Sequence, residues 1–263
     1  MSESTVLCEV DGRGVATLSL NRPAVNNAYD GAMLGALAAH VHRLADDPAV
    51  RVLVLRGKGR HFQAGADLGW LQAVSRDTPE ANLAASRLTG GAVRGLDGLS
   101  KPTIALVHGA CVGGGTGVAA ACDVVIAERT ATFAISEVRW GVAATVIFPQ
   151  LNQAIGIRNV RRYAQTCERF DAEEARRIGL VHVVCEPGGL DDAVAPIIEG
   201  LLNAAPGALA VSKASALRCA GAPVSEEEFD RLVREHSERR QSDEAGEGFA
   251  SFHGKRSARW YPG

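Results

Sequence analysis

Residues 104–141 read IALVHGACVGGGTGVAAACDVVIAERTATFAISEVRWG, and the fold prediction starts from them. The stretch begins with an apolar run at 104–107, which has the length of a buried strand. Three glycines follow at 113–115, and small residues at 118–121 then predict a helix. A helix that starts directly after a glycine turn has backbone N–H groups without intrahelical partners, and these groups and the helix dipole favour a negatively charged oxygen. The stretch therefore predicts a strand–turn–helix unit that can stabilise an anion.

A single acidic residue, Glu137, lies near the end of this stretch among mostly uncharged residues. A second stretch, HFQAGADL at 61–68, follows another buried apolar run at 52–55 and supplies a partner for the first. Chemistry through an enolate requires a turn that holds the oxygen and a carboxyl group that moves the proton. We therefore expect the two stretches to form an active site, with Glu137 as its acid or base.

The order of predicted strands and helices indicates an α/β fold. Apolar residues alternate at 6–10 and 15–20 around a glycine-containing turn, which predicts a β-hairpin. Further strands are expected at 50–56, 104–107, 122–127, 132–135 and 181–185, and helices at 30–45, 68–74, 79–95, 118–121, 159–165 and 171–179. This alternation predicts a mainly parallel central sheet with helices outside it. From residue 191 the pattern is only helical, so we divide the chain into a core, 1–190, and a helical region, 191–263.

Composition and charge exclude several classes of function. The chain has 263 residues, 46% of them hydrophobic, and a formal net charge of -2, which gives no general attraction to nucleic acid or to an anionic membrane. No apolar run approaches the roughly 18 residues of a membrane span. The first residues, MSESTVLCEV, lack the features of a signal peptide, and the six cysteines show no C-x-x-C spacing. We expect reduced thiols and a cytoplasmic protein.

Motifs for other chemistries are missing or weak. The sequence contains no phosphate-binding P-loop, no complete dinucleotide-binding glycine motif, no G-x-S-x-G nucleophile elbow and no metal-ligand spacing. Ser136 has no nearby histidine to activate it. Cys111 lies beside the glycine turn and is a candidate reactive thiol or, more simply, a core residue. The arginines at 158, 161 and 162 have helical spacing and are interpreted as a solvated face rather than an RNA site.

Five segments together resemble the crotonase (enoyl-CoA hydratase/isomerase) family: NRPAVNNA, HFQAGADL, VHGACVGGG, FAISEVRWG and GFASFHGKR. Each segment alone is weak, but their order and spacing cover nearly the whole chain. The resemblance implies a spiral of β-β-α units with a helical C-terminal region that packs at a trimer interface and covers the neighbour's acyl-CoA site. It also implies a homotrimer or dimer of trimers that acts on an acyl-CoA thioester, with coenzyme A present only as part of the substrate.

The resemblance also assigns site residues. The oxyanion donors are the backbone N–H groups of Ala66 and Gly114, and at Gly114 a glycine lets the substrate approach the backbone closely. Trp140 is a candidate for lining the acyl pocket, as is Trp70, and a core position is the alternative for both. The residues expected at the coenzyme A moiety are Gln63, Ala64, Gly65, Asp67 and Leu68 in the chain itself, and Phe252 and Lys255 of a neighbouring subunit. Arg256, beside Lys255, also suits a phosphate.

The acidic residues leave the reaction type open. Family hydratases have two glutamates; Glu137 matches the second, whereas Gly117 stands at the position of the first. Asp67 is either a further catalytic acid or, as we favour, a residue that fixes its loop through backbone N–H groups. Water addition to a 2-enoyl-CoA is the leading hypothesis. A Δ3-Δ2 enoyl-CoA isomerase with one acid/base, or a non-catalytic acyl-CoA-binding protein, is the alternative.

The segment SEVRWG and the apolar residues at 142–149 resemble one branch of the family in particular. That branch contains bacterial hydratases of methylglutaconyl-CoA and isohexenylglutaconyl-CoA, which belong to leucine and acyclic-terpene degradation. Their substrates carry a second carboxylate, which needs a cation. Arg139 and Arg87 are candidates, and a solvated surface position is the alternative for each.

Overall fold

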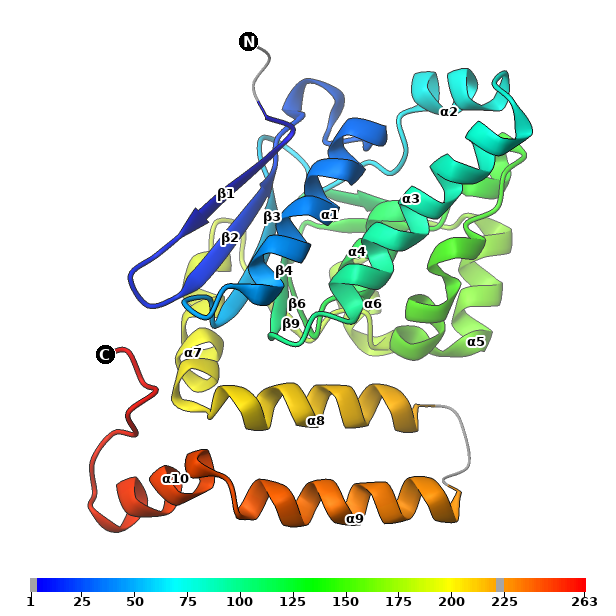
Figure 1. The fold of residues 1–263 in the computed structure, drawn as a ribbon. Helices are drawn as coiled ribbons and strands as arrows, with labels where there is room; N and C mark the ends of the chain where they lie inside the picture. Colours follow the sequence, from blue (N-terminus) through cyan, green and yellow to red (C-terminus); the bar gives the residue numbers. More distant parts are fainter. Residues whose placement is uncertain (1–3, 221–224) are drawn as a thin grey trace.

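A six-stranded sheet lies at the centre of the computed structural model, which describes residues 4–220 and 225–263 (Figure 1). Its strands are, in spatial order, β1 (Val6–Val10), β2 (Val15–Leu20), β3 (Val52–Gly57), β4 (Thr103–Val107), β6 (Val124–Glu128) and β9 (Val183–Cys185). The hairpin β1–β2 is antiparallel, and all other neighbours in this sheet are parallel. A smaller sheet contains β5 (Ala110–Val112), β7 (Thr132–Ala134) and β8 (Phe170–Asp171). The predicted α/β fold with a mainly parallel sheet is confirmed.

The helices are placed largely where their capping signals predict. They are α1 (Gly31–Asp46), α2 (Leu68–Ser75), α3 (Pro79–Asp97), α4 (Gly114–Ala120), α5 (Phe148–Thr166), α6 (Ala172–Ile178), α7 (Leu190–Asn203), α8 (Pro206–Cys219), α9 (Glu226–Arg240) and α10 (Asp243–His253), with 3-10 turns η1 (Pro23–Val25), η2 (Glu137–Trp140) and η3 (Thr145–Ile147). Side chains of Thr78, Asp171 and Ser225 accept hydrogen bonds from backbone N–H groups at the starts of α3, α6 and α9. These side chains satisfy donors that a helix start otherwise leaves unpaired.

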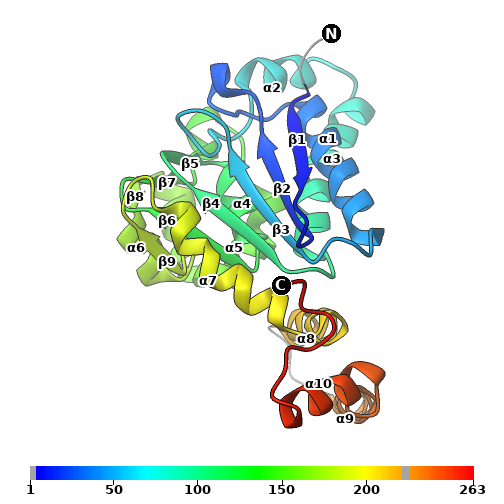
Figure 2. The same ribbon diagram turned by 90° about the vertical axis from the view of Figure 1, so that its left-hand side faces the viewer.

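Both faces of the large sheet are covered, which explains why its strands are apolar at nearly every position. Leu53 and Leu55 of β3 pack toward the core that α1 and α3 share, whereas Val52 and Val54 pack toward α7. Successive strand side chains point to opposite faces, so a strand buried on both sides is read as a continuous apolar run. Figures 1 and 2 show α7 on one side of the sheet and α1 and α3 on the other.

Two predicted element boundaries were wrong. The helix expected at 118–121 begins earlier, at Gly114, because packing inside the core overrides the low helix propensity of glycine. The helix expected at 159–165 is the last part of α5, which begins at Phe148. The segment at 142–149, expected to be a loop, contains η3 and the start of α5. Within α5, Gly156 has a φ of 73° and interrupts the helix.

The C-terminal region forms a layer below the core. Helices α8 and α9 lie side by side in both views, and α10 leads to the C-terminus (Figures 1 and 2). Arg218 of α8 donates hydrogen bonds to Glu235 of α9 at 2.7 and 2.8 Å. Large apolar side chains of this layer that are exposed in the single chain are Phe229, Val233, Phe249 and Phe252.

Among the described residues, no single helix has both the length and the hydropathy of a membrane span. Helices α7 and α8 have the length and hydropathy of a span only when they are counted as one segment, and the chain bends by 105° between them.

Candidate active site

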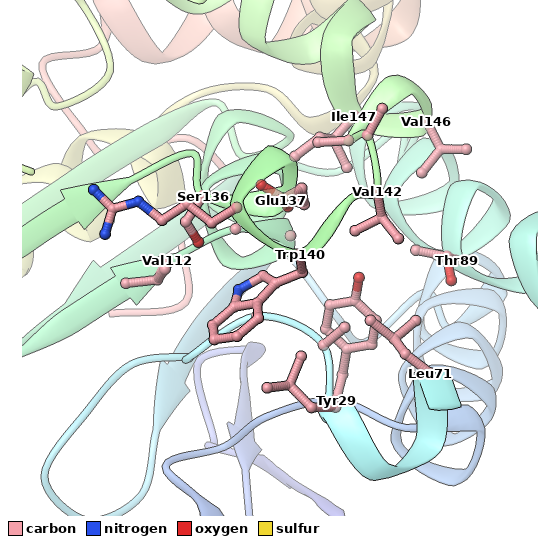
Figure 3. A pocket seen from close by; sticks show the side chains of 18 of the residues that line it. Tyr29, Leu71, Thr89, Val112, Ser136, Glu137, Trp140, Val142, Val146 and Ile147 are labelled. Carbon is pink, nitrogen blue, oxygen red and sulfur yellow. The ribbon is translucent and has the colours of Figure 1, made fainter. Parts of the chain in front are cut away.

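A cavity of about 460 Å³ lies where α4 begins, and the loop after β3, helices α2 and α3, and the segment from Ser136 to Ile147 enclose it (Figure 3). Among the residues named from the sequence, those that line it are Ala64, Gly65, Ala66, Leu68, Gly114, Ser136, Glu137, Arg139 and Trp140. The two stretches predicted to form an active site therefore meet in one cavity.

The backbone around Ala66 and Gly114 leaves two N–H groups available. Tyr29 donates its N–H to the carbonyl of Gly65 and accepts from the N–H of Asp67, both at 2.8 Å. Because backbone groups of an extended segment alternate in direction, the N–H of Ala66 points away from Tyr29. Gly114 is the first residue of α4, and within the described chain neither its N–H nor that of Ala66 has a backbone acceptor. Both can donate to an oxyanion.

Glu137 reaches this turn from η2. Its Oε1 lies 2.9 Å from the point where a Cβ atom of Gly113 would stand, so the close approach requires glycine there. Gly113 also has a φ of 57°, which side chains other than glycine disfavour. Burial raises the pKa of Glu137, and within the described residues its Oε2 is buried without a hydrogen-bond partner. A desolvated carboxyl group with a raised pKa is suited to accept and return a proton near neutral pH.

Ile147 occupies the space beside Gly117. A Cβ atom added at Gly117 would overlap the Cβ and Cγ2 atoms of Ile147, whose side chain lines the cavity. The position that the sequence matched to the first glutamate of two-glutamate hydratases is therefore covered by an apolar side chain. The described cavity has Glu137 as its only carboxyl-bearing lining residue.

The comparisons with known proteins agree with this geometry. The family model described as Enoyl-CoA hydratase/isomerase matches residues 11–262.

The chain belongs to the enoyl-CoA hydratase/isomerase family.

It is 32% identical over 219 residues to a short-chain-enoyl-CoA hydratase of Clostridium acetobutylicum, with 81% of each chain covered. It is 31% identical over 254 residues to the peroxisomal Delta(3,5)-Delta(2,4)-dienoyl-CoA isomerase of Arabidopsis thaliana, covering 92% of this chain and 91% of that protein. The crystal structure of an enoyl-CoA hydratase from Shewanella pealeana superposes with a TM-score of 0.93 at 33% identity, over 97% of this chain and 96% of the other. The protein is thus an enzyme of a family whose members act on acyl-CoA thioesters.

Asp67 and Gln63 of this family member do not line the cavity. The carboxylate of Asp67 accepts from the N–H groups of Gly69 at 2.9 Å and Trp70 at 3.2 Å, and it pairs with Arg22 at 3.1 Å. Hydrogen bonding from the Trp70 N–H holds the pKa of Asp67 below its ordinary value. Gln63 is buried, and its backbone bonds to the β5 segment. Asp67 is therefore placed to fix the start of α2, the role favoured from the sequence, and its contact with coenzyme A stays a prediction.

The Asp67→Asn variant is expected to keep kcat within about threefold of the wild type, because the amide oxygen still accepts the two N–H groups and only the partly buried ion pair to Arg22 weakens. Steady-state turnover of the enoyl-CoA substrate measures this. A loss of a hundredfold or more would instead identify Asp67 as a catalytic acid.

Of the aromatic and cationic residues predicted at the acyl pocket, some line the cavity and others do not. Trp140 lines the cavity and is 62% exposed, whereas Trp70 packs edge-on against Tyr29 with ring centroids 6.1 Å apart. Arg139 lines the cavity and donates to the carbonyl of Cys167 at 3.1 Å, but Arg87 is exposed and does not line it. A second arginine, Arg169, lines the cavity unpredicted, because it arrives from the segment after α5.

The C-terminal residues lie away from this cavity in the same chain. Phe252 lies on α10 and is 81% exposed. Figure 1 shows α10 at the opposite end of the molecule from α2. Lys255 follows α10 and is also exposed, so a contact of either residue with coenzyme A remains a prediction about a neighbouring subunit. Arg256 pairs with Glu247 at 2.6 Å, and a contact of Arg256 with a phosphate likewise stays a prediction.

Two further residues lie at the glycine turn, Cys111, which was predicted from the sequence, and Tyr29, which was not. Cys111 is fully buried, and burial raises the pKa of its thiol, so the simpler of the two alternatives, a core residue, is confirmed. Tyr29 was not predicted at all, although its side chain lines the cavity and its hydroxyl points inward (Figure 3). Tyr29 directly follows the segment NRPAVNNA, and only the fold brings it to the glycine turn.

Proposed function

We propose that this enzyme is a hydratase that adds water to a 2-enoyl-CoA. The observation that supports this most directly is the desolvated carboxyl group of Glu137 against the turn that presents the N–H groups of Ala66 and Gly114. A thioester bound with its carbonyl oxygen at these two donors has its β-carbon open to attack from the Glu137 side.

In the proposed reaction, Glu137 takes one proton from water as the water oxygen forms a bond to the β-carbon. The π electrons move to the thioester oxygen, and the resulting enolate is held by the two N–H groups. Each such donor contributes on the order of 3 kcal/mol to the transition state. Glu137 then returns the proton to the α-carbon, so one carboxyl group serves both steps and ends as it began.

The substrate we propose is a branched glutaconyl-type thioester. Two arginines, Arg139 and Arg169, line the cavity that contains Glu137, and an Arg guanidinium matches the geometry of a carboxylate. Apolar side chains on the α2 and α3 side of the same cavity, among them Leu71, Val142 and Val146, suit the hydrocarbon part (Figure 3). A thioester with a carboxylate at its far end would use both.

The test is absorbance of the conjugated enoyl thioester with purified protein and three substrates: crotonyl-CoA, a 3-enoyl-CoA and 3-methylglutaconyl-CoA. Loss of conjugation from a 2-enoyl-CoA supports the hydratase. Gain of conjugation from the 3-enoyl-CoA, without hydration, would instead support the isomerase alternative, which the single carboxyl group and the apolar Ile147 wall favour. No change with all three would contradict both.

For the glutaconyl specificity, Arg169→Gln is expected to raise KM for 3-methylglutaconyl-CoA about tenfold, because an ion pair to the substrate is lost, and to leave KM for crotonyl-CoA unchanged. Arg87→Gln is the matched control, since Arg87 is exposed and outside the cavity. Equal effects of Arg169→Gln on both substrates would argue against recognition of a carboxylate.

We also propose that the enzyme works in the cytoplasm as a homotrimer or dimer of trimers and needs no cofactor beyond the coenzyme A of its substrate. The exposed apolar side chains of α9 and α10 support an interface there. In such an assembly Phe252 and Lys255 would contact the coenzyme A bound by a neighbour. Light scattering gives the mass of the assembly in solution.

A further inference from the structure

The hydroxyl of Tyr29 makes no hydrogen bond that stabilises the fold within the described residues. The chain contains three tyrosines, and the other two each bond a glutamate: Tyr163 to Glu174 and Tyr261 to Glu199. In the described part of the chain, the hydroxyl of Tyr29 has no hydrogen-bond partner, although the residue is only 8% exposed. The hydroxyl faces the cavity, so it is free to hydrogen-bond a water or a ligand there.

The Tyr29 ring is fixed at the reacting end of the cavity. A Cβ atom added at Gly114 would stand 2.5 Å from Cε1 and 2.7 Å from Oη of Tyr29, so this side chain packs directly on the residue that supplies an oxyanion donor. Trp70 supports the ring from the other side. Figure 3 shows the hydroxyl of Tyr29 directed into the cavity, toward the side on which Glu137 lies.

We propose that the hydroxyl of Tyr29 is the second polar group of the reaction and holds the attacking water, a role that rests on the proposed hydration. A water between the two side chains would accept a hydrogen bond from Tyr29 Oη and donate one to the carboxylate of Glu137, which lines the same cavity. Tyr29 would thus hold the attacking water, which Gly117 cannot do because it has no side chain.

The protonation states fit this division of roles. Burial raises the pKa of Tyr29, and the charge of Glu137 raises it further, so the phenol stays protonated and acts as a donor at neutral pH. During hydration the water proton goes to Glu137 and returns from Glu137 to the α-carbon. Tyr29 keeps its own proton throughout and only orients the water oxygen toward the β-carbon.

The Tyr29→Phe variant separates water positioning from proton transfer, since the ring and its packing remain. With crotonyl-CoA, kcat for hydration is expected to fall about 50-fold with KM little changed, the size typical of losing a positioned hydrogen-bonding group in catalysis. Exchange of the α-protons of butyryl-CoA in D₂O, followed by NMR, uses Glu137 and the two N–H donors but adds no water. That exchange rate is expected to stay within about threefold of the wild type.

Tyr261→Phe is the matched control, because it removes a tyrosine hydroxyl that bonds Glu199 away from the cavity, and it should change neither rate. Hydration by Tyr29→Phe at the wild-type rate would overturn the proposal, and so would an equal loss of hydration and exchange. If the wild type exchanges α-protons but hydrates no substrate, the proposed hydratase function fails first and the water-holding role fails with it.

Discussion

The Glu137→Gln variant is expected to lower kcat for hydration by about a thousandfold or more, because the amide can neither take the proton of water nor return one to the α-carbon. Glutamine keeps the size of the side chain beside Gly113, so binding of the thioester should persist. Calorimetric titration with butyryl-CoA is expected to give a Kd within about threefold of the wild type.

Glu9→Gln provides the control for this change. Glu9 is exposed on β1, far in the fold from the cavity, and its replacement should alter neither kcat nor binding. If Glu137→Gln turned over substrate at close to the wild-type rate, the catalytic role of Glu137 would be refuted. If it lost binding and turnover together, its role would be to shape the cavity.

The pH dependence of the wild type gives an independent readout of the same group. Glu137 must be ionised to act as a base, and burial raises its pKa above the ordinary value of about 4.3. Activity should therefore fall as pH decreases through that raised pKa, and kcat/KM should show an acid limb above the range of a solvated carboxyl group. A profile that stays flat down to about pH 5 would contradict a desolvated Glu137 as the base.

The sequence identified those parts of the site that local motifs encode. Ala66, Gly114 and Glu137 each lie in a segment with its own glycine or turn pattern, and the structure brings all three to one cavity. Caps such as Thr78 and Ser225 were predictable because the side-chain oxygen and the backbone N–H that donates to it lie within one turn of chain.

The remaining parts depend on distant segments. Tyr29, Ile147 and Arg169 enter the cavity from the segment between η1 and α1, from η3 and from the segment after α5, and no local signal marks any of them. The start of α4 was misplaced because three glycines have low helix propensity, whereas burial of the turn in the core favours the helix. Helix propensity therefore predicts a helix start poorly where tertiary packing determines it.

Gly117, which stands at the position matched to the first glutamate, packs against Ile147, and this contact can be tested by substitution. Gly117→Ala is expected to destabilise the protein by about 3 kcal/mol, because the new methyl group overlaps the Cβ and Cγ2 atoms of Ile147 and small-to-large core changes strain side chains or backbone. Urea unfolding at one fixed protein concentration measures the free energy of unfolding, since any assembly would add a concentration term.

Gly35→Ala is the matched control within a helix. A Cβ atom at Gly35 meets nothing within 4 Å, so alanine there should be neutral or stabilise by up to about 1 kcal/mol through helix propensity. Opposite signs at two helical glycines would show that the cost at Gly117 comes from contact rather than from backbone conformation.

Ile147→Ala tests whether the two positions are coupled. It removes Cγ2 and the rest of the side chain beyond Cβ, so a small shift of η3 is then enough to admit the methyl group at 117. The double variant should be more stable than the sum of the single effects predicts by at least about 1 kcal/mol. Additive effects would mean that Gly117 tolerates a side chain independently of Ile147. Coupling would mean instead that a side chain cannot be introduced at 117 by one substitution, because Ile147 occupies the space that a carboxyl group at 117 would need.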